Sequence, residues 1–122
     1  MTTYERVFST LSRLGIPCAL QSFPAGDGKG GGAPSPPFIC YLSDGSNDLY
    51  ADDGLWCRIP IVRVELYEAS ADWDLETRVE TLINDEFGPC SVTEDWVESE
   101  HCRMVTYTFS ATPEPAGREE GN

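Results

Sequence analysis

The segment from Pro36 to Tyr67 reads PPFICYLSDGSNDLYADDGLWCRIPIVRVELY and decides the fold of this 122-residue chain. Two apolar runs, Phe38 to Leu42 and Ile59 to Leu66, enclose the polar stretch DGSNDLYADDG. A strand, a turn region rich in Asp, Gly, Ser and Asn, and a longer second strand are typical of a β-hairpin. We therefore expect the other elements to pack around a hairpin with a polar tip.

The second strand of this hairpin changes the face on which its apolar side chains lie. Before the change one face holds Cys57, Ile59 and Ile61, and after it the opposite face holds Val62, Val64 and Leu66. Because side chains alternate strictly along a strand, the switch predicts either a bulge or a strand whose two halves are covered from opposite sides. Pro60 cannot donate to a ladder, so its half of the strand is expected at a sheet edge or beyond it.

These observations divide the hairpin into two halves. The inner half, 38–42 against 62–66, is expected to belong to the core of the domain. The outer half, around 44–61, is expected to project past the domain and to be covered there by another subunit. A projecting hairpin that reaches a neighbour explains both the change of face and the position of Pro60.

Two segments show the spacing of amphipathic helices. The first begins with a capping box formed by Thr2 and Glu5 and ends at Gly15. The second begins at Ser70 or Asp72 and ends at Gly88. Its apolar stripe consists of Trp73, Leu75, Val79, Leu82, Ile83 and Phe87. The like-charged pair Glu76 and Glu80 is interpreted as part of a solvated face.

Further strands are predicted at 18–23, 90–98 and 102–111. The resulting order predicts an α+β fold in a single small domain over residues 1–112, with a mixed or antiparallel sheet of about four or five strands, a projecting β-hairpin and two packed helices. Residues 24–36 are rich in Gly and Pro and are expected to form a mobile loop. Residues 113–122 are expected to form a disordered tail.

The composition is that of an acidic globular protein. Hydrophobic residues make up 40% of the chain, charged residues make up 24%, and the net charge is −13. This charge repels phosphate backbones and counts against direct nucleic-acid binding, although an acidic surface also suits a channel past which DNA slides without sticking. Because no long apolar run or signal peptide is present, we expect a soluble cytosolic protein without membrane contact. The five widely spaced cysteines are expected to be reduced packing residues.

Catalytic and cofactor patterns find little support. The glycines at 26, 28 and 31 match a dinucleotide fingerprint in form only, because no helix start follows them. The single histidine, His101, has only Cys102 beside it, so a clustered metal site or a nucleophilic triad is not expected. The paired carboxylates are expected to be solvated. We therefore expect no enzymatic activity and no cofactor.

A calcium-binding module remains open as an alternative of a different class. The stretch from Asp44 to Asp53 is dense in side-chain oxygens, which are the ligands that Ca²⁺ prefers. It departs from the EF-hand pattern because Leu49 stands where Gly is required and no Glu falls at the last position.

Aromatic and large apolar residues within polar segments indicate protein contacts. The residues of this kind are Leu49, Tyr50, Trp56, Trp73 and Trp96. Core packing is the competing interpretation, which we favour for Trp73 and leave open for Tyr50 and Trp56. With the neighbouring polar and charged residues of the hairpin, the candidate subunit or partner interface consists of Asn47, Leu49, Tyr50, Asp52, Trp56, Arg58, Arg63 and Glu65. Charge reversal of Arg63 or Glu65 is expected to weaken subunit association more than folding.

Short sequences between Tyr4 and about Phe109 carry a resemblance to a known family. They are Leu14-Gly15-Ile16-Pro17, Ser22-Phe23-Pro24, Pro37-Phe38-Ile39, Gly45-Ser46-Asn47 followed by Tyr50-Ala51-Asp52, Val64-Glu65-Leu66-Tyr67, and Glu94 to Glu100. In these the chain resembles the tail terminator, or tail completion, proteins of long-tailed bacteriophages and prophages. The motifs are structural and not catalytic. The Gly-rich insert from Gly26 to Ala33 departs from the family pattern, and its contacts stay open.

The resemblance implies a small α/β protein that forms a ring, expected to be a hexamer, on the head-proximal end of the finished tail tube. Such a ring stops tube polymerisation and joins the tube to the capsid neck. The implied partners are further copies of the chain, the tail tube protein and a neck or connector protein, with DNA passing through the lumen without specific binding. The implied location is the virion tail, after assembly in the bacterial host cytoplasm. A head-tail neck adaptor is the alternative within the same class.

Overall fold

The computed structural model describes residues 3–20, 35–51, 54–111 and 114–115. The helical segments are α1 (Thr3–Leu11), the 3-10 turn η1 (Ser12–Leu14), α2 (Trp73–Phe87) and the 3-10 turn η2 (Glu98–Glu100). The strands are β1 (Cys18–Leu20), β2 (Phe38–Ala51), β3 (Gly54–Glu68), β4 (Ser91–Val97), β5 (Cys102–Ser110) and β6 (Glu114–Pro115).

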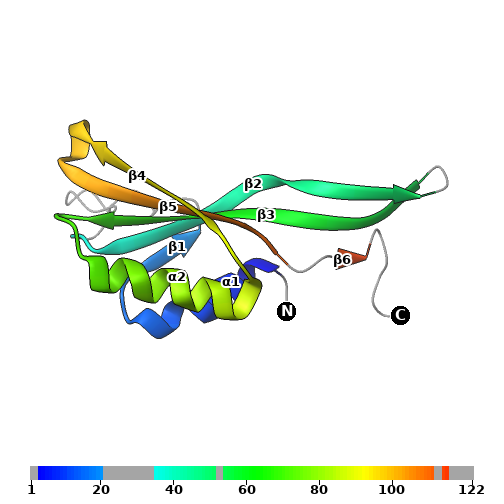
Figure 1. Cartoon of the computed structure of the whole chain (residues 1–122), viewed down its shortest axis with the longest axis horizontal. Helices are drawn as coiled ribbons and strands as arrows, with labels where there is room; N and C mark the ends of the chain where they lie inside the picture. The colour runs from blue at the N-terminus through cyan, green and yellow to red at the C-terminus, as the bar shows by residue number, and fades with distance from the viewer. Residues whose placement is uncertain (1–2, 21–34, 52–53, 112–113, 116–122) are drawn as a thin grey trace, which may run out of the picture.

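The strands form one open, mixed sheet in the order β1-β2-β3-β5-β4, and both α-helices lie on the same face of it (Figure 1). β1 runs parallel to β2, whereas the pairs β2–β3, β3–β5 and β4–β5 are antiparallel. β6 pairs with β3 at Cys57 and Arg58, outside this order. The predicted α+β class, with two helices packed on a sheet and a projecting hairpin, is confirmed.

The core lies between the two helices and the inner part of the sheet. Val62, Val64 and Leu66 of β3 are fully buried, because every second residue of this strand faces the helices. The helices contribute Val7, Leu11, Leu75, Val79 and Ile83, and the neighbouring strands contribute Ile39, Tyr41, Val105, Tyr107 and Phe109. The four consecutive residues Phe38 to Tyr41 are all buried, which confirms the prediction of a central strand covered on both faces.

Local signals in the sequence account for the ends of both helices. The carboxylate of Asp72 accepts a hydrogen bond of 3.1 Å from the backbone N–H of Leu75, so Asp72 caps α2. Gly15 has a left-handed conformation with φ of 76° and ends the first helical segment. The proposed partner of Glu5 in the capping box, Thr2, lies outside the described residues.

The hairpin contains a bulge next to the position where β3 changes its apolar face. Ser43 pairs with Val62 and Ser46 pairs with Pro60, so two residues of β2, Asp44 and Gly45, lie opposite one residue of β3. Gly45 has φ of 92°, a conformation that side chains rarely adopt. The bulge thus lies in β2 and not in the strand that changes face, and β3 keeps its alternation, so its two halves present their apolar side chains to opposite faces, which is the second of the two predicted possibilities.

Pro60 lies where β5 has ended. Its carbonyl oxygen accepts a hydrogen bond of 2.8 Å from the backbone N–H of Ala111, while its partner across the hairpin is Ser46. The backbone N and O atoms of a strand residue point to the same side of the strand, so the nitrogen of Pro60 also points toward the side of β3 on which β5 and β6 pair. Pro60 lies between the β5 pairing, which begins at Ile61, and the β6 pairing at Cys57 and Arg58, so its lack of an N–H interrupts neither pairing. Pro60 is therefore accommodated between two pairings on the same side of β3, and not at a sheet edge as predicted.

One expectation about a polar segment is wrong. The stretch predicted as a turn continues both strands, because β2 extends to Ala51 and β3 begins at Gly54. Of the expected disordered tail, the structure describes only the short strand β6 at Glu114–Pro115. Residues 21–34, which include most of the predicted mobile loop and the end of the predicted strand 18–23, lie outside the described residues, as do residues 116–122.

All five cysteines are free, and Cys40 and Cys102 are buried. Burial raises the pKa of the Cys18 thiol to about 12 and also raises the pKa values of Cys40, Cys90 and Cys102. These thiols therefore remain protonated and weakly nucleophilic at neutral pH. Cys40 and Cys102 therefore pack as predicted, whereas Cys57 lies on the outer half of the hairpin and is half-buried.

Candidate subunit interface

The outer half of the hairpin extends past the helices. Figure 1 shows β2 and β3 continuing well beyond the ends of α1 and α2, with β6 alongside. In this region the hairpin pairs Ser46 to Ala51 with Gly54 to Pro60. The start of α1 approaches this region only near the bulge, at Ser46, Arg58 and Pro60, and neither α-helix covers the rest of it (Figure 1). A two-stranded ribbon without a packed layer is marginally stable in water, so a further protein surface would stabilise it.

The apolar side chains of the outer half lie on the face away from the helices. The extra residue of the bulge belongs to β2, and β3 pairs in register from Cys57 to Pro60 and again from Ile61 onward, so the side chains of β3 alternate through this region. Since Val62 faces the helices, Ile61, Ile59 and Cys57 point to the opposite face, and all three are half-buried. We call Cys57, Ile59 and Ile61 the apolar row. It was not included among the predicted interface residues, although the change of face had already singled it out.

The other face of the outer half is polar. Arg58 Nε lies 3.3 Å from Asp48 Oδ1, and the hydroxyl of Ser46 donates a 2.7 Å hydrogen bond to the same oxygen. The hydrogen bond from Ser46 and the charge of Arg58 lower the pKa of Asp48. Tyr50 follows on this face and is 71% exposed, so core packing is excluded for its side chain. Near the bulge this face borders a cavity of about 390 Å³ that also reaches Thr3 and Tyr4 of α1.

Arg63 and Glu65 lie on the inner half, on the same face as the apolar row. Arg63 Nη1 is 3.7 Å from Asp44 Oδ1 in the bulge, and its Nε is 3.2 Å from Glu65 Oε2. The contact with Glu65 is an ion pair and lacks good hydrogen-bond geometry, because Arg63 Nε is without a hydrogen-bond partner among the described residues. The Tyr67 hydroxyl donates a 2.8 Å hydrogen bond to Glu65 Oε1. Both residues therefore have partners within their own chain.

The structure separates the predicted interface residues into groups. Tyr50 and Arg58 share the polar face of the outer half, whereas Arg63 and Glu65 lie on the opposite face beyond the bulge. Asn47, Leu49 and Trp56 are in the outer strands, but their side chains lie outside the description, and so does all of Asp52.

Two predictions about α2 are wrong. Trp73 is the first residue of α2, is 70% exposed and does not belong to the core. Glu76 was interpreted as solvated but is buried. Its two carboxylate oxygens accept hydrogen bonds of 2.9 and 3.1 Å from Arg103 of β5. The sequence gives no local signal for this pair, which is separated by 27 residues.

Arg103 gathers three carboxylates at the end of the domain that lies away from the hairpin. Besides Glu76, its Nε lies 3.4 Å from Glu68 Oε1, and its Nη2 lies 3.3 Å from Glu94 Oε1. Glu68 is 2% exposed. Neither oxygen of Glu68 makes a hydrogen bond of good geometry among the described residues. The backbone of Asp72 and the charge of Arg103 favour the ionised form, but burial and a hydrogen bond shared with Glu76 favour the protonated form more strongly. Burial, together with the neighbouring Glu76, accordingly raises the pKa of Glu68.

The oxygen-rich stretch that suggested calcium is part of the hairpin strands. Asp44 and Asp48, the two of its aspartates that the structure describes, each contact an arginine. Among the described residues, no group of three or more His, Cys, Asp or Glu side chains is placed to hold a metal ion. Within the same part of the chain, neither helix is long and apolar enough to cross a membrane.

Comparison with known proteins adds no family assignment. The chain matches no protein-family model and no curated protein.

Proposed function

We propose that this protein is a tail terminator of a long-tailed bacteriophage or prophage, a virion structural protein that forms a ring on the tail tube. The observation that carries the proposal is the apolar row on a hairpin that extends past the helices (Figure 1). A second copy that covers Ile59 and Ile61 would bury apolar surface that the chain alone leaves half-exposed. The resemblance in the short motifs described above supplies the family.

The position of the hairpin favours a head-to-tail contact. We call the outer half of the hairpin the arm and the rest of the domain the body. The arm and the body are different surfaces, so a contact between the arm of one copy and the body of the next is a heterologous interface. Interfaces of this type close into a ring when the rotation between copies permits it. A hexameric ring is the assembly that the family resemblance implies.

The charge of the chain suits a ring through which DNA passes. The chain carries 21 acidic residues against 8 Lys and Arg. A lumen lined by carboxylates repels phosphate groups, so DNA would move through it without specific binding.

Tube capping in solution tests this function. The protein is added to polymerising tail tube protein from the same genome, and tube lengths and tube ends are followed by electron microscopy. We expect tubes that stop growing and carry one extra ring of density at one end. Tubes that keep growing, with bare ends at saturating protein, would contradict the proposal.

A pull-down then distinguishes the terminator from the neck adaptor. The protein is offered tail tube protein and the capsid connector protein in separate experiments. A terminator retains the tube protein, whereas retention of the connector protein alone would favour the adaptor.

A further inference from the structure

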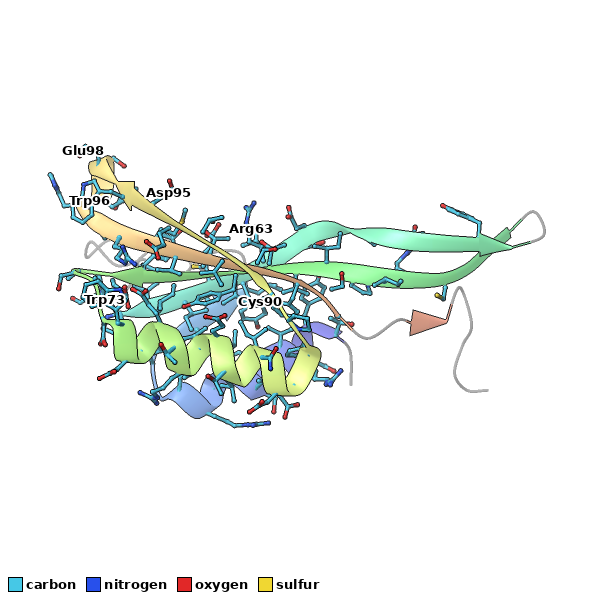
Figure 2. The ribbon with its side chains drawn as sticks, viewed as in Figure 1. Arg63, Trp73, Cys90, Asp95, Trp96 and Glu98 are labelled. Carbon is cyan, nitrogen blue, oxygen red and sulfur yellow. The ribbon has the colours of Figure 1, made fainter. Side chains whose placement is uncertain are left out.

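Trp73 and Trp96 are exposed at the same end of the molecule, far from the hairpin. Trp73 begins α2 and is 70% exposed, and Trp96 lies near the end of β4 and is 54% exposed. Figure 2 shows both tryptophans at the end opposite the hairpin arm, with Asp95 and Glu98 near Trp96. Tryptophan is rarely left this exposed on a free surface, whereas it is enriched at protein interfaces.

Each tryptophan borders a hollow. Trp73 lines a cavity of about 510 Å³ together with Pro36, Pro37, Asp74 and neighbouring residues. Trp96 lines a second cavity of about 490 Å³ with Asp95, Glu94 and Arg103. The small residues Ala69, Ser70 and Ala71 line both cavities, so the two hollows adjoin each other. Each is large enough for one long side chain.

The hollows are acidic. Asp74 in the first and Asp95 in the second are exposed, and neither makes an ion pair or side-chain hydrogen bond among the described residues. Among the residues that the structure describes, Arg103 is the one basic residue that lines either cavity, and its charge is opposed by Glu68, Glu76 and Glu94. The indole N–H of Trp96 donates a 3.1 Å hydrogen bond to Glu98 Oε1, which restrains the ring and adds a carboxylate at its edge.

We propose that these two adjoining hollows bind two basic side chains, arginine in preference to lysine, from one segment of a protein partner. A cation over the face of a tryptophan is attracted by the ring, and guanidinium groups also stack on aromatic faces. A carboxylate beside each ring can form an ion pair with the same cation. A guanidinium group can donate two parallel N–H···O hydrogen bonds to that carboxylate. The net charge of −13 guides a basic partner to the surface. This inference holds whether or not the protein forms a tail ring.

The test uses the full chain and the peptide acetyl-Gly-Arg-Gly-Arg-Gly-amide at low ionic strength. The indole N–H signals of Trp73 and Trp96 are followed by NMR during the titration. We expect saturable shifts of both signals and none with the matched peptide that carries Glu in place of Arg. A peptide with Lys should bind less tightly. Shifts that do not saturate, or that the Glu peptide reproduces, would overturn the proposal.

Variants locate the binding. Trp73→Ala and Trp96→Ala should each weaken the affinity roughly threefold, and Asp74→Asn or Asp95→Asn by a similar factor. Tyr50→Ala is the matched control, because Tyr50 is an equally exposed aromatic residue, at 71%, but lies on the hairpin away from the hollows. The affinity of this variant for the Arg peptide should stay unchanged. Circular dichroism confirms that each variant is folded. An equal loss in Tyr50→Ala would show general attraction to an acidic protein and overturn the proposal. Indole shifts that depend on protein concentration without peptide in Ile59→Asp, whose arm no longer assembles, would also overturn it, because a second copy would then be the occupant.

Discussion

Arg103 is the residue on which the packing of α2 against the end of the sheet depends. It joins Glu76 of α2, Glu68 of β3 and Glu94 of β4 from its own place on β5. Nearby, the Tyr107 hydroxyl donates a 3.0 Å hydrogen bond to the backbone carbonyl of Glu76. The pKa of Glu76 is lowered, chiefly by its hydrogen bonds from Arg103, so Glu76 carries the charge of the pair and Glu68 holds the proton.

Replacing Arg103 by Ala is expected to destabilise the protein strongly. The change leaves the buried charge of Glu76 without its partner, which costs about 3 kcal/mol of unfolding free energy. Urea denaturation measures the loss. Arg78→Ala on the exposed side of α2 is the control and should cost less than about 0.5 kcal/mol. A loss of less than about 1 kcal/mol in Arg103→Ala would show that the cluster behaves as a surface ion pair.

Glu68 is expected to make stability depend on pH. Its pKa is raised from 4.5 to about 8 in the folded protein by burial and by Glu76. Between these values the folded state holds a proton that the unfolded state has lost, so the unfolding free energy falls as the pH rises from about 4.5 to about 8. Glu68→Gln cannot ionise and should remove this part of the fall.

Urea midpoints at about pH 5 and about pH 8.5 provide the measurement. Glu80→Gln is the control, because Glu80 is an exposed glutamate of α2, and it should keep the pH dependence of the unmodified protein. If Glu68→Gln loses stability with pH as steeply as the unmodified chain does, Glu68 does not hold the proton.

The residue-scale errors of the sequence predictions share one physical origin. Helical spacing correctly identified the buried positions Leu75, Val79 and Ile83. It could not reveal that Arg103 would reach Glu76, because the pairing of a charged residue is decided by which strand passes the helix. Trp73 was assigned to the same stripe, but at 100° per residue it falls at the margin of the arc that holds Leu75, Val79 and Ile83, and it is exposed at the first residue of α2.

The main feature at the scale of elements is the long hairpin with its bulge. The polar stretch after Ser43 favoured a turn, because Asp, Gly, Ser and Asn are typical turn residues. They form strands here because a ribbon without a helix layer has no face that must be apolar throughout. The change of face in β3 was the more reliable signal, since strict alternation leaves few ways to satisfy it.

Gly45 is expected to be required for the bulge. Its φ of 92° disfavours any side chain, while a Cβ atom added there would meet nothing within 4 Å. Gly45→Ala should therefore lower the unfolding free energy by about 1 kcal/mol through backbone strain alone. Gly54→Ala is the matched control, because that position is equally open and lacks a positive φ. Thermal denaturation measures the stability of both variants, and equal stabilities would show that the positive φ of Gly45 imposes no strain on a side chain.

The molecule as a whole has a packed body and an arm, and we propose that the arm makes the subunit contacts. Ile59→Asp should abolish assembly while leaving the body folded, because Ile59 is half-buried on the arm and makes no part of the core. Val92→Asp on β4 is the control for a partly exposed apolar strand residue of the body, and it should keep assembly. Size-exclusion chromatography with circular dichroism measures both properties. An Ile59→Asp protein that still assembles would rule out the apolar row.

Native mass spectrometry of the purified chain, alone and with tail tube protein, tests the central claim most directly. We expect a closed ring of about six copies of the 13.4 kDa chain, near 80 kDa, and no ladder of larger oligomers of increasing copy number. A 13.4 kDa monomer at every concentration, with tube protein present as well as absent, would contradict it.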